Sequence, residues 1–78
     1  MKRESIVNKL AEIFNISETE NVDEVNITTL PGFDSFRLMN YIVTIEDEFG
    51  VTLTSADTES QQFRTVGGIA NILHKKIS

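Results

Sequence analysis

One serine in this sequence stands where a turn runs into a predicted helix, a position suited to chemical modification. Ser35 follows residues 30–34, Leu-Pro-Gly-Phe-Asp. A serine hydroxyl needs an adjacent base to act as a nucleophile, but the only histidine, His74, stands near the C-terminal end. A phosphate on Ser35 would instead be stabilised by the free N–H groups and the dipole of the helix N-terminus. We therefore expect Ser35 to be an attachment point that another enzyme modifies.

Other kinds of chemistry lack the residues that they need. A serine hydrolase requires a base and oxyanion donors, which the sequence does not place near Ser35. With no cysteine in the chain, it has no thiol, no disulfide framework and no zinc-ligand pattern. The adjacent acids at positions 46–48 point in different directions on a helix, and no loop has the spacing of a calcium site. We expect no catalytic residues and no metal site, and hence no enzyme activity.

The charges are distributed unevenly around a formal net charge of −5. Between Leu10 and Phe63 there are eleven acidic residues, and Arg37 is the only basic one. Such a surface repels nucleic acids and anionic membranes and attracts partners with basic patches, although acidic residues can also serve solubility alone. The first residues lead into an amphipathic segment, so we expect neither a secretory signal nor a membrane span. We expect a cytoplasmic monomer.

The chain has the length of one domain, residues 1–78, with a small core. Apolar residues recur at helical spacing over about residues 3–15, which predicts a first helix. Residues 16–34 then form a long predicted loop, well beyond the usual connection of about 4–6 residues. The loop carries scattered aliphatic residues, which suggest that it packs over the core: Val22, Val25, Ile27 and Leu30.

The second predicted helix is the one that begins at Ser35. Asp34 is its expected N-cap, and the helix should run to about Phe49 and stop at Gly50. It has a wide apolar stripe that we expect in the core, made of Leu38, Tyr41, Ile42, Ile45 and Phe49. A second stripe consists of Phe36, Met39 and Val43, flanked at its far end by Glu46 and Asp47. The second stripe could pack under the long loop, but we expect it to be an exposed patch for a partner.

Two further helices complete the predicted fold. Thr54 and the residues after it are of the types that cap helices, and they predict the start of a short helix over about residues 56–62. Thr65 caps a last helix whose core positions are Val66, Ile69, Ala70, Leu73 and Ile77. The pair Gly67-Gly68 implies close backbone approach to a neighbour. We predict an all-α fold, a small four-helix bundle of three main helices and one short helix, with a long loop between helices one and two.

Three segments resemble the acyl carrier protein family. Residues 32–36 (Gly-Phe-Asp-Ser-Phe) are similar to its Gly-x-Asp-Ser-Leu signature. Residues 46–51 (Glu-Asp-Glu-Phe-Gly-Val) resemble the acidic end of its second helix, and residues 63–69 (Phe-Arg-Thr-Val-Gly-Gly-Ile) resemble the start of its last helix. The segments occur in the family's order, and the resemblance spans essentially the whole chain.

The resemblance implies a covalent cofactor and a set of partner enzymes. A phosphopantetheinyl transferase would use coenzyme A and a magnesium ion to attach 4′-phosphopantetheine to Ser35, next to Asp34. The arm ends in a thiol that holds acyl groups as thioesters, which explains how a chain without cysteine can carry them. Acyl-transferring, condensing or modifying enzymes would use basic patches on their own surfaces to dock on the second helix of this chain. The partner-binding residues implied there are Phe36, Arg37, Met39, Asn40, Val43, Glu46 and Asp47.

The sequence also departs from the family's usual pattern. Arg37 and Asn40 stand where acidic residues are usual, Phe36 replaces a leucine, and Gly68 stands where aspartate is common. The departures favour a freestanding carrier dedicated to a specialised pathway, such as polyketide or modified-lipid synthesis, over the housekeeping carrier of fatty-acid synthesis. Two alternatives stay open: an aminoacyl or peptidyl carrier, and a helical interaction module that uses the same scaffold without a prosthetic group. Insertion of an acyl chain into the bundle also stays open, with Ile42, Val51, Ile69 and Ala70 as the side chains that would allow it.

Overall fold

The computed structural model describes residues 2–17 and 21–77. Within them the chain forms four α-helices and three short 3₁₀ helices, and one isolated bridge between Asn26 and Thr65 is the only β pairing. The elements follow in the order α1 (Arg3–Ile13), η1 (Val22–Glu24), η2 (Ile27–Thr29), α2 (Ser35–Phe49), α3 (Ser55–Glu59), η3 (Gln61–Arg64) and α4 (Val66–Ile77). This confirms the all-α bundle of three main helices and one short helix.

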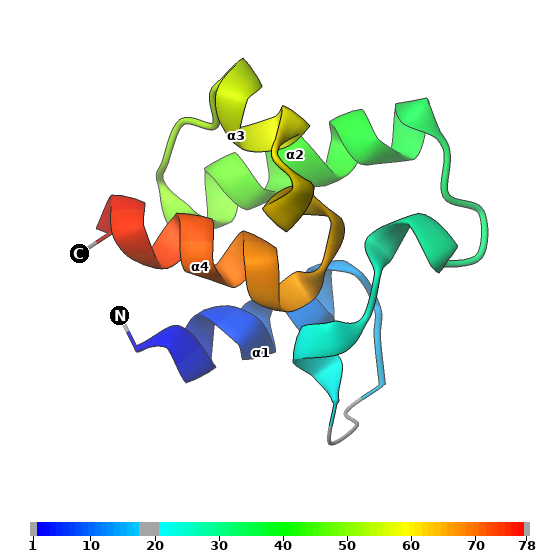
Figure 1. The fold of residues 1–78 in the computed structure, drawn as a ribbon, viewed down its shortest axis with the longest axis horizontal. Coiled ribbons are helices and arrows are strands. Elements are labelled where there is room, and N and C mark those ends of the chain that lie inside the picture. Colours follow the sequence, from blue (N-terminus) through cyan, green and yellow to red (C-terminus); the bar gives the residue numbers. More distant parts are fainter. Residues whose placement is uncertain (1, 18–20, 78) are drawn as a thin grey trace.

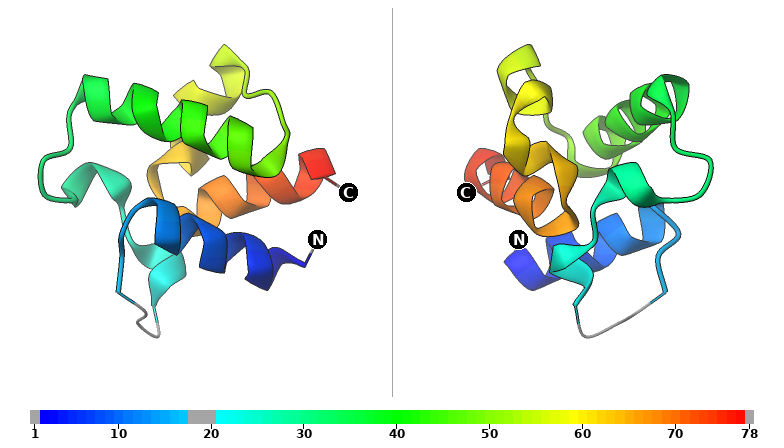
Figure 2. Two further views of the ribbon diagram at one scale, coloured as in Figure 1. Left: turned by 180° about the vertical axis from the view of Figure 1, so that it is seen from behind. Right: turned by 45° about the vertical axis from the view of Figure 1, so that its right-hand side comes forward.

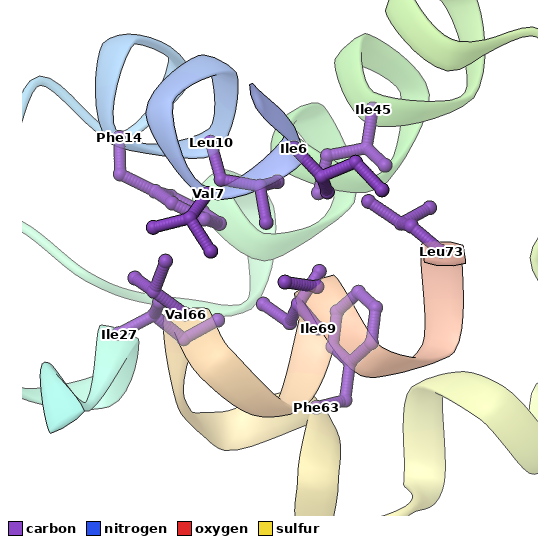
Figure 3. Packing of buried hydrophobic residues seen from close by; sticks show 11 residues of the cluster. Ile6, Val7, Leu10, Phe14, Ile27, Ile45, Phe63, Val66, Ile69 and Leu73 are labelled. Carbon is purple, nitrogen blue, oxygen red and sulfur yellow. The ribbon is translucent and has the colours of Figure 1, made fainter. Parts of the chain in front are cut away.

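The three main helices are arranged around one core. Helices α1 and α4 lie side by side, with the start of α1 and the end of α4 on the same side of the molecule, and α2 packs over them (Figures 1 and 2). Figure 3 shows Ile6 and Leu10 of α1 facing Ile69 and Leu73 of α4, with Ile45 of α2 closing the cluster. All five side chains are fully buried. Each main helix therefore contributes its apolar stripe to the same core.

Helix α1 is shorter than the sequence pattern predicted. It ends at Ile13 with Phe14 as its C-cap, and the expected end at residue 15 was wrong. The physical reason is that Asn15 adopts a left-handed conformation, φ 57°, which asparagine tolerates better than most residues and which terminates a right-handed helix. Phe14 keeps its place in the core, where its ring meets that of Tyr41 edge to face at 4.7 Å between centroids.

The long connection between α1 and α2 packs over the core, as its scattered aliphatic residues predicted. It is not wholly irregular, because η1 and η2 lie within it. Ile27 is 1% exposed, and Val22, Val25 and Leu30 pack against the core. The connection is also tied to the start of α4, since the Val66 N–H donates to the Val25 carbonyl at 3.1 Å. Residues 18–20 of the predicted loop lie outside the described residues.

The short third helix predicted over about residues 56–62 is confirmed as an α-helix, but its bounds were wrong. Helix α3 spans Ser55–Glu59, and η3 begins after a break at Ser60. The capping box of Thr54 and Asp57 fixes the start of α3. Ser60 is extended, and its hydroxyl accepts the N–H of Gln62 at 3.1 Å. The side chain of Ser60 thus gives the backbone an alternative to the α-helix and starts a new turn.

An ion pair joins α3 to the end of α4. Lys76 Nζ lies 2.8 Å from Asp57 Oδ2, with the two side chains 27% and 22% exposed. The hydrogen bond from Lys76 and that from the Thr54 N–H lower the pKa of Asp57 from 3.8 to about 2. Because the folded-state pKa is the lower one, this carboxylate stabilises the fold above pH 3.8 and loses its contribution as the pH falls through about 2.

This ion pair gives a pH-dependent prediction. Asp57→Asn should lower the thermal unfolding midpoint at pH 6, and its deficit relative to the wild type should shrink as the pH falls from about 4 to 2. The matched control is Glu59→Gln on the same helix, because Glu59 has no ion pair within the described part of the chain. Melting curves across this pH range check the prediction, and a deficit of Asp57→Asn that stays constant with pH would contradict it.

Candidate functional site

Ser35 is the first residue of α2, and it is exposed. Asp34 precedes it as the N-cap and accepts the Arg37 N–H with Oδ1 at 2.7 Å, as predicted. The N–H groups of Ser35 and Phe36 have no acceptor among residues 2–17 and 21–77. They are the free donors of a helix N-terminus, where a phosphate group binds favourably. The Ser35 hydroxyl therefore stands in the open beside two unused hydrogen-bond donors.

A tight turn fixes the direction in which the chain enters α2. The Phe33 N–H donates to the Leu30 carbonyl at 3.1 Å, and Gly32 between them has φ 75°. Pro31 and Gly32 occupy the two central positions, as expected for a type II turn, which favours proline first and needs glycine second. Leu30 and Phe33 pack against the core at either end of the turn. The turn is therefore anchored, and Ser35 is held at the surface by a fixed backbone.

The two apolar stripes of α2 face different environments. Ile45 is fully buried, and Leu38, Tyr41, Ile42 and Phe49 pack against the core around it. Phe36, Met39 and Val43 are 74%, 66% and 56% exposed. We call these three side chains the exposed stripe. The predicted exposure of this stripe is confirmed, and the alternative in which it packs under the long connection was wrong.

The acidic residues at the end of α2 differ in their contacts. Asp47 is exposed and has no ion pair within the described ranges. Glu48 pairs with Lys9 of α1 at 2.9 Å. Glu46 Oε2 accepts the Leu53 N–H at 2.8 Å, so this side chain fastens the connection between α2 and α3. The sequence did not indicate that contact, because no local pattern links a glutamate to a backbone group seven residues later.

Arg37 is placed in a way that the sequence did not predict. Its guanidinium group folds back over the turn: a Cβ atom at Gly32 would lie 3.5 Å from Arg37 Nη2 and 3.6 Å from Cζ and Nε. No carboxylate of the described chain pairs with it. Asn40, the other departure from the acidic pattern, is exposed one turn further along α2. A positive charge therefore lies beside the turn that delivers Ser35.

The remaining surface offers little to a ligand. A cleft of about 400 Å³ opens between α3, η3 and α4 and is lined by Ala56, Asp57, Ser60, Gln62, Asn71, Ile72, Lys75 and Lys76. Ile69 and Ala70, which the sequence suggested as walls for an acyl chain, are fully buried in the core, and Ile42 and Val51 are partly buried. In the described residues, no helix is long and apolar enough to cross a membrane, and no cluster of three acidic or histidine side chains could hold a metal ion.

Comparisons with known proteins agree with this geometry. The family model for the phosphopantetheine attachment site matches residues 4–73. The chain is 37% identical over 81 residues to an acyl carrier protein of Thermotoga maritima, covering 96% of this chain and 95% of that protein. It is 32% identical over 84 residues to an acyl carrier protein of Petrotoga mobilis, covering 100% and 94%. A third acyl carrier protein, from Lactobacillus acidophilus, is 34% identical over 73 residues and 86% of each chain.

The fold and the matched attachment-site model define a carrier domain for a covalently bound 4′-phosphopantetheine. Within that class, the chain belongs to the acyl carrier protein family. It is therefore a carrier and not an enzyme. The start of α2 fits the cofactor, because Ser35 is exposed at a helix N-terminus whose first two N–H groups have no acceptor in the described residues, and because the cationic Arg37 lies against the turn before it.

Proposed function

We propose that Ser35 carries the 4′-phosphopantetheine arm and that the chain presents acyl thioesters on it to partner enzymes. The observation that supports this most strongly is the exposed Ser35 hydroxyl at the first position of α2, behind an anchored turn. The arm supplies a thiol, which the chain itself lacks because it has no cysteine. Tethering the acyl group to the carrier raises its effective concentration at each docked enzyme.

Attachment of the arm, which we call loading, would be a phosphoryl-type transfer. This chain would provide only the nucleophile, and the transferase would provide the rest of the catalytic groups. Ser35 Oγ would form a bond to the phosphorus next to the pantetheine group of coenzyme A, and the bond between that phosphorus and the oxygen of the adenosine bisphosphate would break. The hydroxyl proton must leave to a base on the transferase, because the protein's only histidine, His74, lies in the last turn of α4. The chain contributes an accessible hydroxyl in a fixed position.

The test of the attachment is the intact mass of the protein. The wild-type chain is incubated with coenzyme A, magnesium and a transferase of broad specificity. We expect its mass to increase by one phosphopantetheine group. A folded wild-type chain that gains no mass would overturn the proposal and would favour the interaction module without a prosthetic group.

We propose that partners dock on the exposed stripe and on Asp47 beside it. Apolar side chains that are exposed in the free protein release water when a partner covers them. The acidic charge steers partners with basic patches, so association should be fast and sensitive to salt. Arg37 and Asn40, in place of the usual acids, set this surface apart and support a carrier dedicated to a specialised pathway.

The docking surface can be tested by truncating its apolar side chains. Met39→Ser and Val43→Ser should each raise the KM of the transferase about tenfold, which corresponds to ~1.4 kcal/mol of lost binding. Both side chains are exposed, so the fold should persist and circular dichroism should be unchanged. Asn8→Ser, on the exposed face of α1, is the matched control. If both stripe variants are loaded with the wild-type KM, the docking surface lies elsewhere.

A further inference from the structure

Arg37 is the feature of this site to which the proposed function gives no part in holding the arm. It is the only basic residue between Leu10 and Phe63, a segment with eleven acidic ones. No carboxylate pairs with its guanidinium in the part of the chain that the structure describes. Instead, Nε, Cζ and Nη2 lie 3.5–3.6 Å from the position that a Cβ atom on Gly32 would occupy. The cation thus lies against the turn at Gly32, three residues before Ser35 in the sequence, with no carboxylate partner among residues 2–17 and 21–77.

The local geometry places this charge at the turn that leads into Ser35. Three guanidinium atoms at 3.5–3.6 Å from the position of a Cβ on Gly32 place the group in contact with the turn. The adjacent carboxylate of Asp34 caps the Arg37 backbone N–H with Oδ1 and forms no ion pair with the guanidinium of Arg37 in the described structure. Within the described residues, Arg37 is therefore a cation without a carboxylate partner, at the turn before the serine to which the proposed modification would add an anion.

We infer that Arg37 is the counter-ion of the phosphodiester that attaches the arm to Ser35, an inference that depends on the proposed function. A guanidinium group presents a planar fork of donors that matches two phosphate oxygens. The free N–H groups of Ser35 and Phe36 lie at the same helix end and complete the set of donors. The three groups together would hold the base of the arm, while the rest of the arm stays free to reach partner enzymes.

The pairing would make the docking surface depend on the state of the carrier. Before loading, the start of α2 presents the positive charge of Arg37, which repels a partner with a basic patch. Loading adds one negative charge at Ser35 and neutralises Arg37 in the pair. Enzymes that use the loaded carrier would therefore meet less repulsion than they do from the unloaded one.

The test compares the three arginine side chains before and after loading. Nitrogen-15 spectra report the Nε–H group of each, and its exchange with water reports protection. Arg3 serves as the engaged standard, because its Nε donates to Asn71 Oδ1 at 2.7 Å and its Nη1 pairs with Asp23 at 2.8 Å. Arg64 is exposed on η3 and has no ion pair within the described ranges, so it serves as the free standard.

On loading, exchange of the Arg37 Nε–H should slow about fivefold, the protection expected of a good surface ion pair, while Arg3 and Arg64 stay unchanged. The phosphorus-31 resonance of the loaded protein should shift in Arg37→Gln and move back in Arg37→Lys, with Arg64→Gln as the control. An Arg37 signal that is the same in both forms would overturn the inference. Protection that appears only after a partner enzyme is added would also overturn it and would assign Arg37 to that partner. A failure of the proposed function can be told apart from a failure of this inference, because in that case the intact mass of the protein would not increase after incubation with coenzyme A and the transferase.

Discussion

Ser35→Ala is expected to contain no thiol after incubation with coenzyme A and a transferase, whereas the wild type should gain one thiol per chain. The contrast is complete because the chain has no cysteine, so every free thiol must come from the attached arm. Alanine at the first position of α2 removes an exposed hydroxyl and no hydrogen bond of the described structure, so stability should change by less than about 0.5 kcal/mol. Thiol titration with a chromogenic disulfide gives the count.

A matched control tests whether the arm is attached to Ser35 in particular or to any exposed serine at the start of a helix. Ser55 is also exposed and is the first residue of a helix, α3, behind the N-cap Thr54. Ser55→Ala should therefore gain one thiol like the wild type. If Ser35→Ala gains a thiol, or if Ser55→Ala fails to gain one while folded, the assignment of the arm to Ser35 is wrong.

Gly68→Ala is expected to cause the largest loss of stability among single substitutions that leave the core side chains intact. A Cβ atom at this position would lie 1.9 Å from the Gln62 carbonyl oxygen and 2.7 Å from its carbon. Both atoms are backbone, so η3 would have to move away from α4, and with it Phe63, which is 3% exposed in the core. We expect a cost of about 3 kcal/mol or more, against a total of roughly 4–12 kcal/mol for a chain of this length.

Urea unfolding followed by circular dichroism measures this loss, and Gly50→Ala is the control. Gly50 is the left-handed C-cap of α2, with φ 64° and no atom within 4 Å of a Cβ. Alanine there should cost only about 1 kcal/mol, the strain of a left-handed residue. If Gly68→Ala unfolds at the same urea concentration as Gly50→Ala, η3 does not pack on α4 as closely as described.

The sequence predicted α2 well because the signals for its start and end are local. Asp34 caps the helix through its own side chain, and Gly50 ends it through its own backbone conformation. The exposed stripe was also predictable, since helical periodicity places Phe36, Met39 and Val43 away from the core side of the helix. The same local logic located Ser35 at the surface.

The features that sequence reasoning missed come from residues whose type allows more than one conformation or contact. The early end of α1 depends on the conformation of Asn15, and the division into α3 and η3 depends on the hydroxyl of Ser60. Glu46 fastens a backbone group in the next connection, and Arg37 turns back onto Gly32. In each case the residue type allowed several roles, and only the fold selected one.

The position of the arm can be measured directly by peptide mass spectrometry of the loaded protein. Cleavage before aspartates releases residues 34–46, a fragment whose only serine is Ser35. We expect this fragment to carry the mass of one phosphopantetheine group, with fragment ions that place it on Ser35. A loaded protein in which residues 34–46 are unmodified and the added mass lies on another fragment would contradict the account.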